Sequence, residues 1–320
     1  MLIPGQYSSW NAAAKQDLKE EIRNITKKYI TLQKLEILMK TISNTEFGGE
    51  RPLFGERGLR LENVTIHAGE SALKCCADIE AVDCRFEGKY PFWHVDGFVV
   101  SHCLFTPGAR AALWYSRNLV MTDTQVDAPK MFREMDGIRL RNVNIPDAEE
   151  TLWHCDNVDI KDVTVDKADY LFMHSRNIRI ENWRQNGNYS FQYCQNVEIR
   201  NAVIHSKDAF WGTENVTIYD SELTGEYLGW HSRRLTLVRC KISGTQPLCY
   251  TRDLTLVDCE FAPDCDLAFE DAEVRATITT PVTSVKNPAR GSIEAPSFGE
   301  IIIDSHSKAV EPVKIIATGK

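Results

Sequence analysis

Short runs of alternating apolar and polar residues recur along most of the chain at nearly constant spacing. Three of them, 138–145 (IRLRNVNI), 158–165 (VDIKDVTV) and 216–223 (VTIYDSEL), begin with an apolar–polar–apolar triplet. Alternation with a period of two is typical of a β-strand that buries one face. Repetition at this period predicts a solenoid. The runs start at intervals of 19 to 21 residues, at positions 59, 79, 98, 119, 138, 158, 178, 197, 216, 235, 254 and 274.

Each repeat also has a polar corner. The fifth residue of the run is mostly Asn or Asp, as at Asn142, Asp162 and Asn201, and two small or apolar positions follow it. Asn and Asp tolerate bends and bond to nearby backbone groups, so we expect a corner between two short strands. Three short strands and no helix per repeat predict an all-β, single-stranded parallel β-helix of about twelve rungs. Rungs stack at about 4.8 Å, which makes a rod on the order of 55 Å long.

The two ends of the chain differ from the repeats. Between 12 and 42 apolar residues recur at spacings of three and four, which predicts a helix. This helix either covers an open end of the solenoid, which we favour, or forms a coiled coil between chains. The predicted organisation is a helical extension over 1–46, the β-helix over 47–280, and a C-terminal cap and tail over 281–320. The helical positions are Leu18, Ile22, Ile25, Tyr29, Leu32, Leu35 and Met39.

Charge and composition narrow the range of partners. The formal net charge is -8, whereas a nucleic-acid-binding surface is basic, so we expect neither a nucleic-acid nor a membrane partner. No run of about 18 apolar residues occurs, as a spanning helix would require. The first residues lack the pattern of a signal peptide, and we predict a cytoplasmic protein. The ten cysteines mostly recur at two repeat positions, which predicts buried thiols in a reducing compartment.

Several longer motifs resemble a known family. Over roughly 47–303 the chain is similar to an uncharacterised bacterial domain-of-unknown-function family of the pectin-lyase-like, right-handed parallel β-helix superfamily. The resemblance implies that the predicted β-helix is right-handed. It implies no catalytic residues, since none are established for that family. The motifs are GERPLF (49–54), ARAALWY (109–115), ETLWHC (150–155), NGNYSF (186–191), SKDAFW (206–211), GEYLGW (225–230) and SVKNP (284–288).

One face of the predicted solenoid, which we call the aromatic wall, carries varied chemistry. The sixth residue before each run is apolar and should point inward, so the fifth should point outward. Five of the seven tryptophans occupy that fifth position, and tyrosines and charged residues precede them. A row of exposed aromatic rings beside polar groups indicates an interaction site, here for a saccharide. The expected ligand-binding residues are Lys89, Trp93, Arg110, Trp114, Lys130, Arg133, Trp153, Tyr170, Tyr189, Lys207, Trp211, Tyr227 and Trp230.

Carboxylates on the wall are candidates for catalysis. Equivalent positions on adjacent rungs lie about 5 Å apart, close to the carboxyl spacing of retaining glycosidases, and alternate rungs about 9.5 Å, near that of inverting ones. The aspartate motifs of β-helix polysaccharide hydrolases are missing. The wall's cations either bind an acidic sugar or pair with neighbouring carboxylates, and neither hypothesis is favoured. The candidate catalytic residues are Glu149, Glu150, Asp169, Asp208 and Glu226.

Four histidines, His94, His154, His174 and His231, share one column of the repeat. A zinc site needs three or four ligands, so we favour structural histidines at a turn. No metal or other cofactor is predicted, and a divalent cation such as Ca²⁺ stays open. The leading hypothesis is a carbohydrate-interacting protein, as a binder, a glycoside hydrolase or a polysaccharide lyase. The alternative is a non-catalytic scaffold whose wall makes protein contacts, including those of a homo-oligomer.

Overall fold

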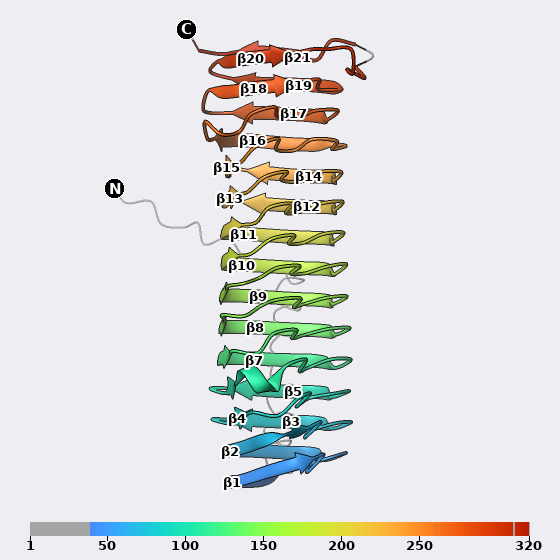
Figure 1. Ribbon diagram of the computed structural model, residues 1–320, viewed down its shortest axis with the longest axis vertical. Coiled ribbons are helices and arrows are strands. Elements are labelled where there is room, and N and C mark those ends of the chain that lie inside the picture. Colours follow the sequence, from blue (N-terminus) through green and yellow to red (C-terminus); the bar gives the residue numbers. More distant parts are fainter. Residues whose placement is uncertain (1–38, 310, 320) are drawn as a thin grey trace, which may run out of the picture.

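The chain folds into a rod of stacked parallel strands, a β-solenoid. The computed structural model describes residues 39–309 and 311–319. The strands follow one another from β1 at one end to β20 and β21 at the other (Figure 1). One continuous parallel ladder passes through Ile42, Leu61, Ala81, Val100, Met121, Leu140, Ile160, Ile180, Ile199, Ile218, Leu237, Leu256, Ala276, Ile293 and Ile315.

These fifteen ladder positions include all twelve predicted repeats in the predicted register. The fold is all-β apart from one short 3-10 turn, η1 (Pro107–Ala109), among the described residues. The strands are β1 (Lys40–Glu50), β2 (Arg57–Glu70), β3 (Ala77–Val82), β4 (Arg85–Phe86), β5 (Asp96–Ser101), β6 (Leu104–Phe105), β7 (Arg117–Val126), β8 (Asp136–Ile145), β9 (Asp156–Val165), β10 (Arg176–Asn186), β11 (Gln195–His205), β12 (Glu214–Tyr219), β13 (Glu222–Thr224), β14 (Arg233–Val238), β15 (Lys241–Ser243), β16 (Leu254–Phe261), β17 (Glu273–Ile278), β18 (Val282–Lys286), β19 (Arg290–Ala295), β20 (Phe298–Ile302) and β21 (Lys314–Ala317).

The polar corner inside each turn forms as predicted. Asn142 and Asn201 adopt left-handed backbone conformations with φ of 52° and 53°, which Asn and Asp tolerate better than most residues. Their side chains also bond to the rung before: Asn142 Nδ2 donates to Asp123 Oδ1 at 2.7 Å, and Asn201 Nδ2 to Asn182 Oδ1 at 2.6 Å. The corner therefore stacks as a ladder of its own along the rod.

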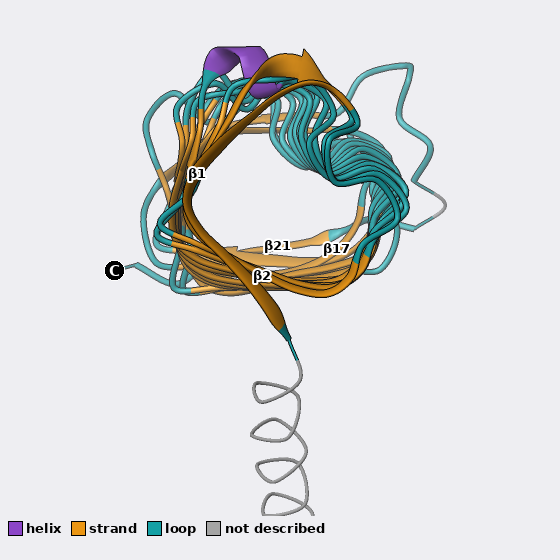
Figure 2. Cartoon of the chain, turned by 90° about the horizontal axis from the view of Figure 1, so that it is seen from below, coloured by secondary structure: helices purple, strands orange, loops and turns teal. Residues whose placement is uncertain are grey.

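The third segment of each turn is not the short strand that we predicted. Its residues form turns in which every second residue is left-handed, as at Tyr170 (φ 58°), Phe172 (60°) and His174 (55°). Seen along the rod, these turns stack in register beside the strands around one interior (Figure 2). The backbone stays bonded to both neighbouring rungs, because Phe172 N–H donates to Thr151 O and His174 N–H to Gln192 O. These bonds offset the steric cost of left-handed non-glycine residues.

The interior is a single apolar core that runs the length of the rod. Phe172, Phe191 and Phe210 are fully buried on consecutive rungs, with ring centroids 4.7 and 4.8 Å apart. Nine of the ten cysteines are buried free thiols, and Cys75 is the exposed one. The repeated cysteines therefore fill core positions, as predicted. Among the described residues, no helix has the length and apolar character needed to cross a membrane.

The solenoid extends further toward both ends than we predicted. The predicted N-terminal helix lies largely outside the described residues, but its last positions do not form a helix, because β1 starts at Lys40 and pairs with β2. Residues 40–46, assigned to the extension, thus belong to the first rung. At the other end β17 pairs with β19, β19 with β21, and β18 with β20. The region predicted as a cap therefore adds two further rungs.

His67 bridges three consecutive rungs and gives a pH-dependent contact. Its Nε2 lies 3.0 Å from Glu46 Oε2 and its Nδ1 3.1 Å from Glu87 Oε2. These hydrogen bonds, first that to Glu46 and then that to Glu87, raise the pKa of His67 above its usual value. A raised pKa means that the contact stabilises the fold below about pH 6.5 and is lost as the pH rises through the folded value.

We expect the NMR titration midpoint of the His67 ring to lie above about 6.5 and to fall in Glu87→Gln. Glu46→Gln should lower it as well, because each carboxylate favours the charged imidazole. A wild-type midpoint at or below the value of the unfolded chain would contradict the bridge.

Candidate functional site

The predicted tryptophans form one column on the outside of the turn segments and are half-buried. They pack in two tilted pairs, with ring centroids 5.5 Å apart for Trp93 and Trp114 and 5.4 Å apart for Trp211 and Trp230. Most of their polar edges are already occupied, which fixes the rings and leaves mainly apolar surface for a ligand. The indole N–H donates to Lys130 O from Trp114 (2.7 Å), to Tyr170 O from Trp153, and to Gln246 O from Trp230 (2.7 Å).

Between Trp114 and Trp153, the tryptophan position of the repeat is occupied by Arg133. The Arg133 guanidinium lies 4.8 Å from the centroid of Trp114 and 4.2 Å from that of Trp153. It donates to the Glu150 carboxylate, and Lys130 Nζ lies 3.1 Å from the same carboxylate. Burial acts to raise the pKa of Glu150, but the hydrogen bonds from Arg133 and Lys130 outweigh it and lower that pKa. These three charged residues therefore satisfy one another.

The other predicted cations are divided between free and paired. Lys89 and Arg110 are exposed, and neither has a carboxylate within 4.0 Å in the described part of the chain. Lys207 Nζ lies 3.3 Å from Glu226 Oε2 and 5.3 Å from the centroid of Tyr227. For Lys130, Arg133 and Lys207 the structure thus has the carboxylate pairing that was one of the two hypotheses.

The predicted carboxylates stand in different environments. Glu149 is exposed, and Asp169 Oδ1 accepts the backbone N–H of Asn188 at 2.7 Å. Glu150 and Glu226 are ion-paired. Asp208 is half-buried, and among the described residues its carboxylate has neither an ion-pair partner within 4.0 Å nor a hydrogen-bond donor. Of the five, Asp208 is therefore the half-buried carboxylate whose oxygens are left free.

The surroundings of Asp208 suit a proton donor. Burial is the largest influence on its carboxyl and raises its pKa, with Lys207 opposing and Glu226 reinforcing the shift. Tyrosines precede and follow it in the same column, since Tyr189 N–H donates to Lys207 O and Asp208 N–H to Glu226 O on the next rung. The pair Trp211 and Trp230 lies on the same two rungs. A carboxyl whose pKa is raised by burial, on the same rungs as aromatic rings, is suited to the role of a glycosidase acid.

The histidines of the column, His94, His154, His174 and His231, have left-handed backbone conformations in the turn segments and were not assigned to the site. His154 and His174 stack with ring centroids 5.2 Å apart, and Tyr193 continues the stack at 4.9 Å. Burial, and next the charge of His154, lowers the pKa of His174. In the part of the chain that the structure describes, no three His, Cys, Asp or Glu side chains converge so as to hold a metal ion.

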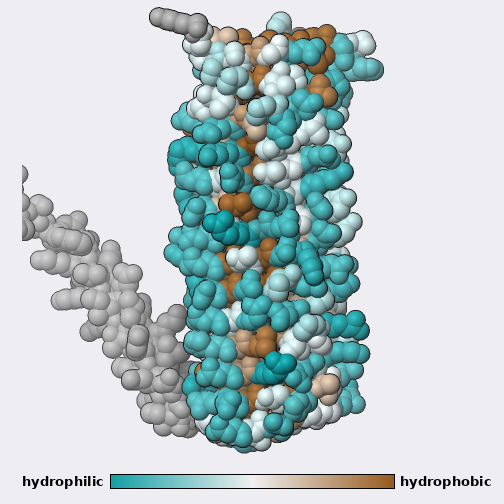
Figure 3. Space-filling model, turned by 60° about the vertical axis from the view of Figure 1, so that its left-hand side comes forward, coloured by the Kyte–Doolittle hydropathy of each residue, from teal (hydrophilic) through white to brown (hydrophobic). Residues whose placement is uncertain are grey.

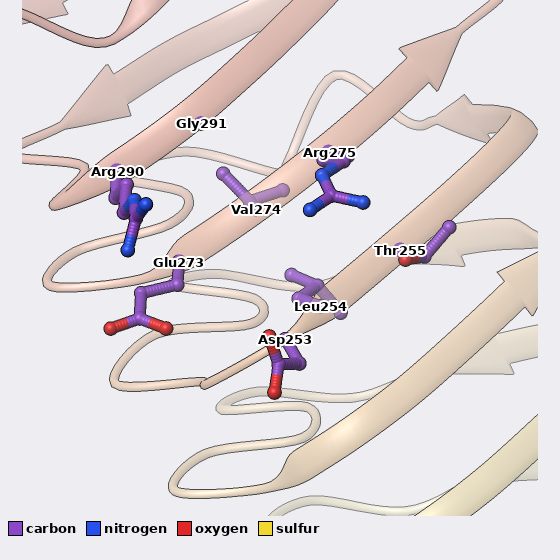
Figure 4. A pocket seen from close by; sticks show the side chains of 8 residues that line it. All are labelled: Asp253, Leu254, Thr255, Glu273, Val274, Arg275, Arg290 and Gly291. Carbon is purple, nitrogen blue, oxygen red and sulfur yellow. The ribbon is translucent and has the colours of Figure 1, made fainter.

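A hollow near the C-terminal end was not anticipated from any motif. It has a volume of about 200 Å³ and lies over β16, β17 and β19, with Arg275 and Arg290 on opposite sides of Val274 (Figure 4). Arg275 falls in the last predicted repeat and Arg290 beyond it, and neither belongs to a motif that the sequence analysis singled out. Only the stacking of the last rungs brings them together.

Comparisons of the backbone path find similar solved structures at low identity. A mutant tailspike of E. coli bacteriophage HK620 has a TM-score of 0.39 at 10% identity, covering 98% of this chain and 75% of that chain. The A-module of mannuronan C-5 epimerase AlgE6 from Azotobacter vinelandii has a TM-score of 0.35 at 9%, covering 89% and 91%. QnrB1, a plasmid-mediated fluoroquinolone resistance protein, has a TM-score of 0.30 at 10%, covering 68% and 93%.

No curated protein matches the chain. A family model does: the model described as "Protein of unknown function (DUF3737)" matches residues 40–316. The match starts at the first residue of β1 and ends within β21, so it covers the solenoid as the structure has it. The chain belongs to this family, DUF3737.

Proposed function

We propose that the aromatic wall binds a saccharide at the segment around Asp208, and that the bound glycoside is hydrolysed there. The observation that carries the proposal is the free, half-buried Asp208 carboxylate on the same two rungs as the packed indoles of Trp211 and Trp230. The two half-buried indoles, tilted by 34° to each other, offer apolar surface for sugar rings to pack against. The indole N–H of Trp211 has no acceptor among the described residues, so it is free to bond a hydroxyl.

Two carboxylates on adjacent rungs supply the chemistry. Asp208, whose pKa is raised chiefly by burial, would give its proton to the glycosidic oxygen as general acid. Glu226 lies one rung further along, with its Oε2 3.3 Å from Lys207 Nζ, and would act as the nucleophile. The two residues lie in neighbouring columns on adjacent rungs, which stack at about 4.8 Å. The proposed mechanism is the two-step, retaining one, in which the two carboxyl groups stand about 5–5.5 Å apart.

The other candidates on adjacent rungs are Glu149 or Glu150 with Asp169. They are less suitable, because Arg133 and Lys130 hold Glu150 and the Asn188 N–H already donates to Asp169 Oδ1.

The binding step is tested with Trp211→Ala in a glycan-array screen that includes neutral and uronic-acid oligosaccharides. We expect saturable binding by the wild type and at least a tenfold loss in the variant, about 1.4 kcal/mol. Trp93→Ala is the matched control, because Trp93 is also a half-buried member of the wall but lies in the other tilted pair. Equal losses in both variants would place binding elsewhere. Dissociation of an oligomer by Trp211→Ala would favour the scaffold alternative.

The hydrolytic step is tested with Asp208→Asn on any glycan that binds. Cleavage should fall by a factor of about 10² or more while binding is retained, since a general acid contributes about 10²–10⁴. Because the raised pKa shows that the fold disfavours charged Asp208, the amide should also raise Tm slightly at pH 7, on the order of 1 °C. Unchanged cleavage in Asp208→Asn would remove it from the mechanism.

A further inference from the structure

The C-terminal hollow is shaped by one glycine. In the ladder that contains Leu254 and Val274, the next rung has Gly291, which carries no side chain and is exposed. Its φ of 113° is left-handed, and a Cβ there would lie 1.8 Å from Val274 O. The backbone of β17 and β19 therefore approaches closely at this point, and the missing side chain leaves a depression between the columns on either side.

Two guanidinium groups flank this depression. Arg275 and Arg290 are exposed, and in the described part of the chain neither has a carboxylate within 4.0 Å. Most of the other arginines in the described chain are paired, for example Arg176 with Asp156 and Arg239 with Asp220, each at 2.6 Å. Unpaired guanidinium groups on two sides of one hollow are suited to bind an oxyanion.

A second cavity adjoins the first and adds positive charge. It has a volume of about 680 Å³ and shares Glu273, Arg290 and Gly291 with the hollow. Lys314, one rung beyond Arg290, also has no carboxylate within 4.0 Å among the described residues. The buried Asp271 does not compete for these cations, because Lys308 and Arg252 already hold it, at 2.7 and 3.4 Å.

The hollow also offers acceptors for hydroxyl groups. Asp253 and Glu273 line its lower edge, and Thr255 lies on its far side (Figure 4). Glu273 is 3.8 Å from Arg252, a distance that leaves its oxygens able to accept hydrogen bonds. A bare anion would use the arginines alone, whereas a hydroxylated molecule with one anionic group would use both sets of residues.

We propose that this C-terminal hollow binds a small hydroxylated molecule through an oxyanion group, a carboxylate or a phosphate, held between Arg275 and Arg290. The site is separate from the aromatic wall and does not depend on it. The combined volume of the two cavities is large enough for a monosaccharide-sized ligand. Glycine at 291 is required, since any side chain would both strain the backbone and fill the depression.

The test is isothermal titration calorimetry of the full chain at 150 mM NaCl with four probes: inorganic phosphate, glucose 6-phosphate, glucuronate and glucose. We expect saturable binding of at least one hydroxylated anion and none of glucose. The double variant Arg275→Gln/Arg290→Gln should weaken that binding at least tenfold. Comparing the phosphate and carboxylate probes identifies the anionic group.

Arg184→Gln is the matched control, because Arg184 is an exposed arginine with no carboxylate within 4.0 Å among the described residues and lies on β10, away from the hollow. It should bind the probes as the wild type does. The proposal is overturned if no anionic probe saturates, if glucose binds as well as the anions, or if Arg184→Gln weakens binding as much as the double variant. Thermal melts of all variants check that each is folded.

Discussion

Replacing Phe191 by Ala is expected to lower the free energy of unfolding by about 3–5 kcal/mol. The ring is fully buried and lies between Phe172 and Phe210, whose centroids are 4.7 and 4.8 Å away. Its loss removes apolar burial and leaves a cavity that the fixed rungs on either side have little freedom to close. Urea unfolding followed by circular dichroism measures the change.

The control for Phe191→Ala is Phe54→Ala, because Phe54 is 54% exposed and should change stability by about 0.5 kcal/mol or less. Since the stability of a solenoid is approximately a sum of terms between neighbouring rungs, the mid-rod cavity should also reduce the cooperativity of unfolding. We expect a lower m-value in Phe191→Ala. Equal losses in the two variants would contradict a core organised around the phenylalanine column.

Replacing Arg133 by Ala should lower the free energy of unfolding by about 2 kcal/mol. The side chain is 16% exposed and lies between two indoles while it donates to Glu150. Breaking a buried ion pair costs about 3–5 kcal/mol; here Lys130 remains beside Glu150, and the site is partly open, so we expect less. Arg133→Lys should recover only part of the loss, because an ammonium group does not stack as a guanidinium does.

The effect of Arg133→Ala should depend on pH. The lowered pKa of Glu150 means that its ion pairs stabilise the fold above about pH 4.5 and are lost as the pH falls through the folded pKa. The difference in the free energy of unfolding between Arg133→Ala and the wild type should therefore become smaller as the pH falls. Arg110→Ala, at an exposed arginine without a carboxylate within 4.0 Å in the described chain, is the control and should change stability by about 0.5 kcal/mol or less at any pH. If the difference in unfolding free energy stayed constant down to pH 3, the contribution of Arg133 would come from its stacking on the indoles and not from the ion pair.

The register of the rungs could be predicted because its signal is local and repeated. Alternation places Val158 and Ile160 inward whatever the rest of the chain does, and a one-residue slip would expose both. The turn segments could not be predicted in the same way. Phe172 and Tyr170 are residues with high strand propensity, and their left-handed conformations arise from bonding to the rungs before and after.

The columns that make up the candidate site could be predicted from the sequence, but the ion pairs between their side chains could not. Spacing alone assigned Trp211 and Trp230 to one column, which the structure has as a tilted pair. Spacing could not distinguish Glu150 from Asp208, since both precede an aromatic or cationic residue by three positions. The two carboxylates differ in their cationic neighbours. Arg133, on the rung before, donates to Glu150, whereas Lys207 pairs with Glu226 and leaves the Asp208 carboxylate free.

The spacing of the hydrogen bonds between neighbouring rungs has a consequence for how the chain folds. Its hydrogen bonds join residues one turn apart, such as Asn201 and Asn182, which are 19 residues apart. In a chain of 320 residues this separation is about 0.06 of the length, a relative contact order as low as that of helical bundles. Although the regular elements among the described residues are strands apart from η1, the chain should therefore fold quickly for a β protein. Closure of a first pair of rungs would be the slow event, and each later rung would add to an edge that already exists.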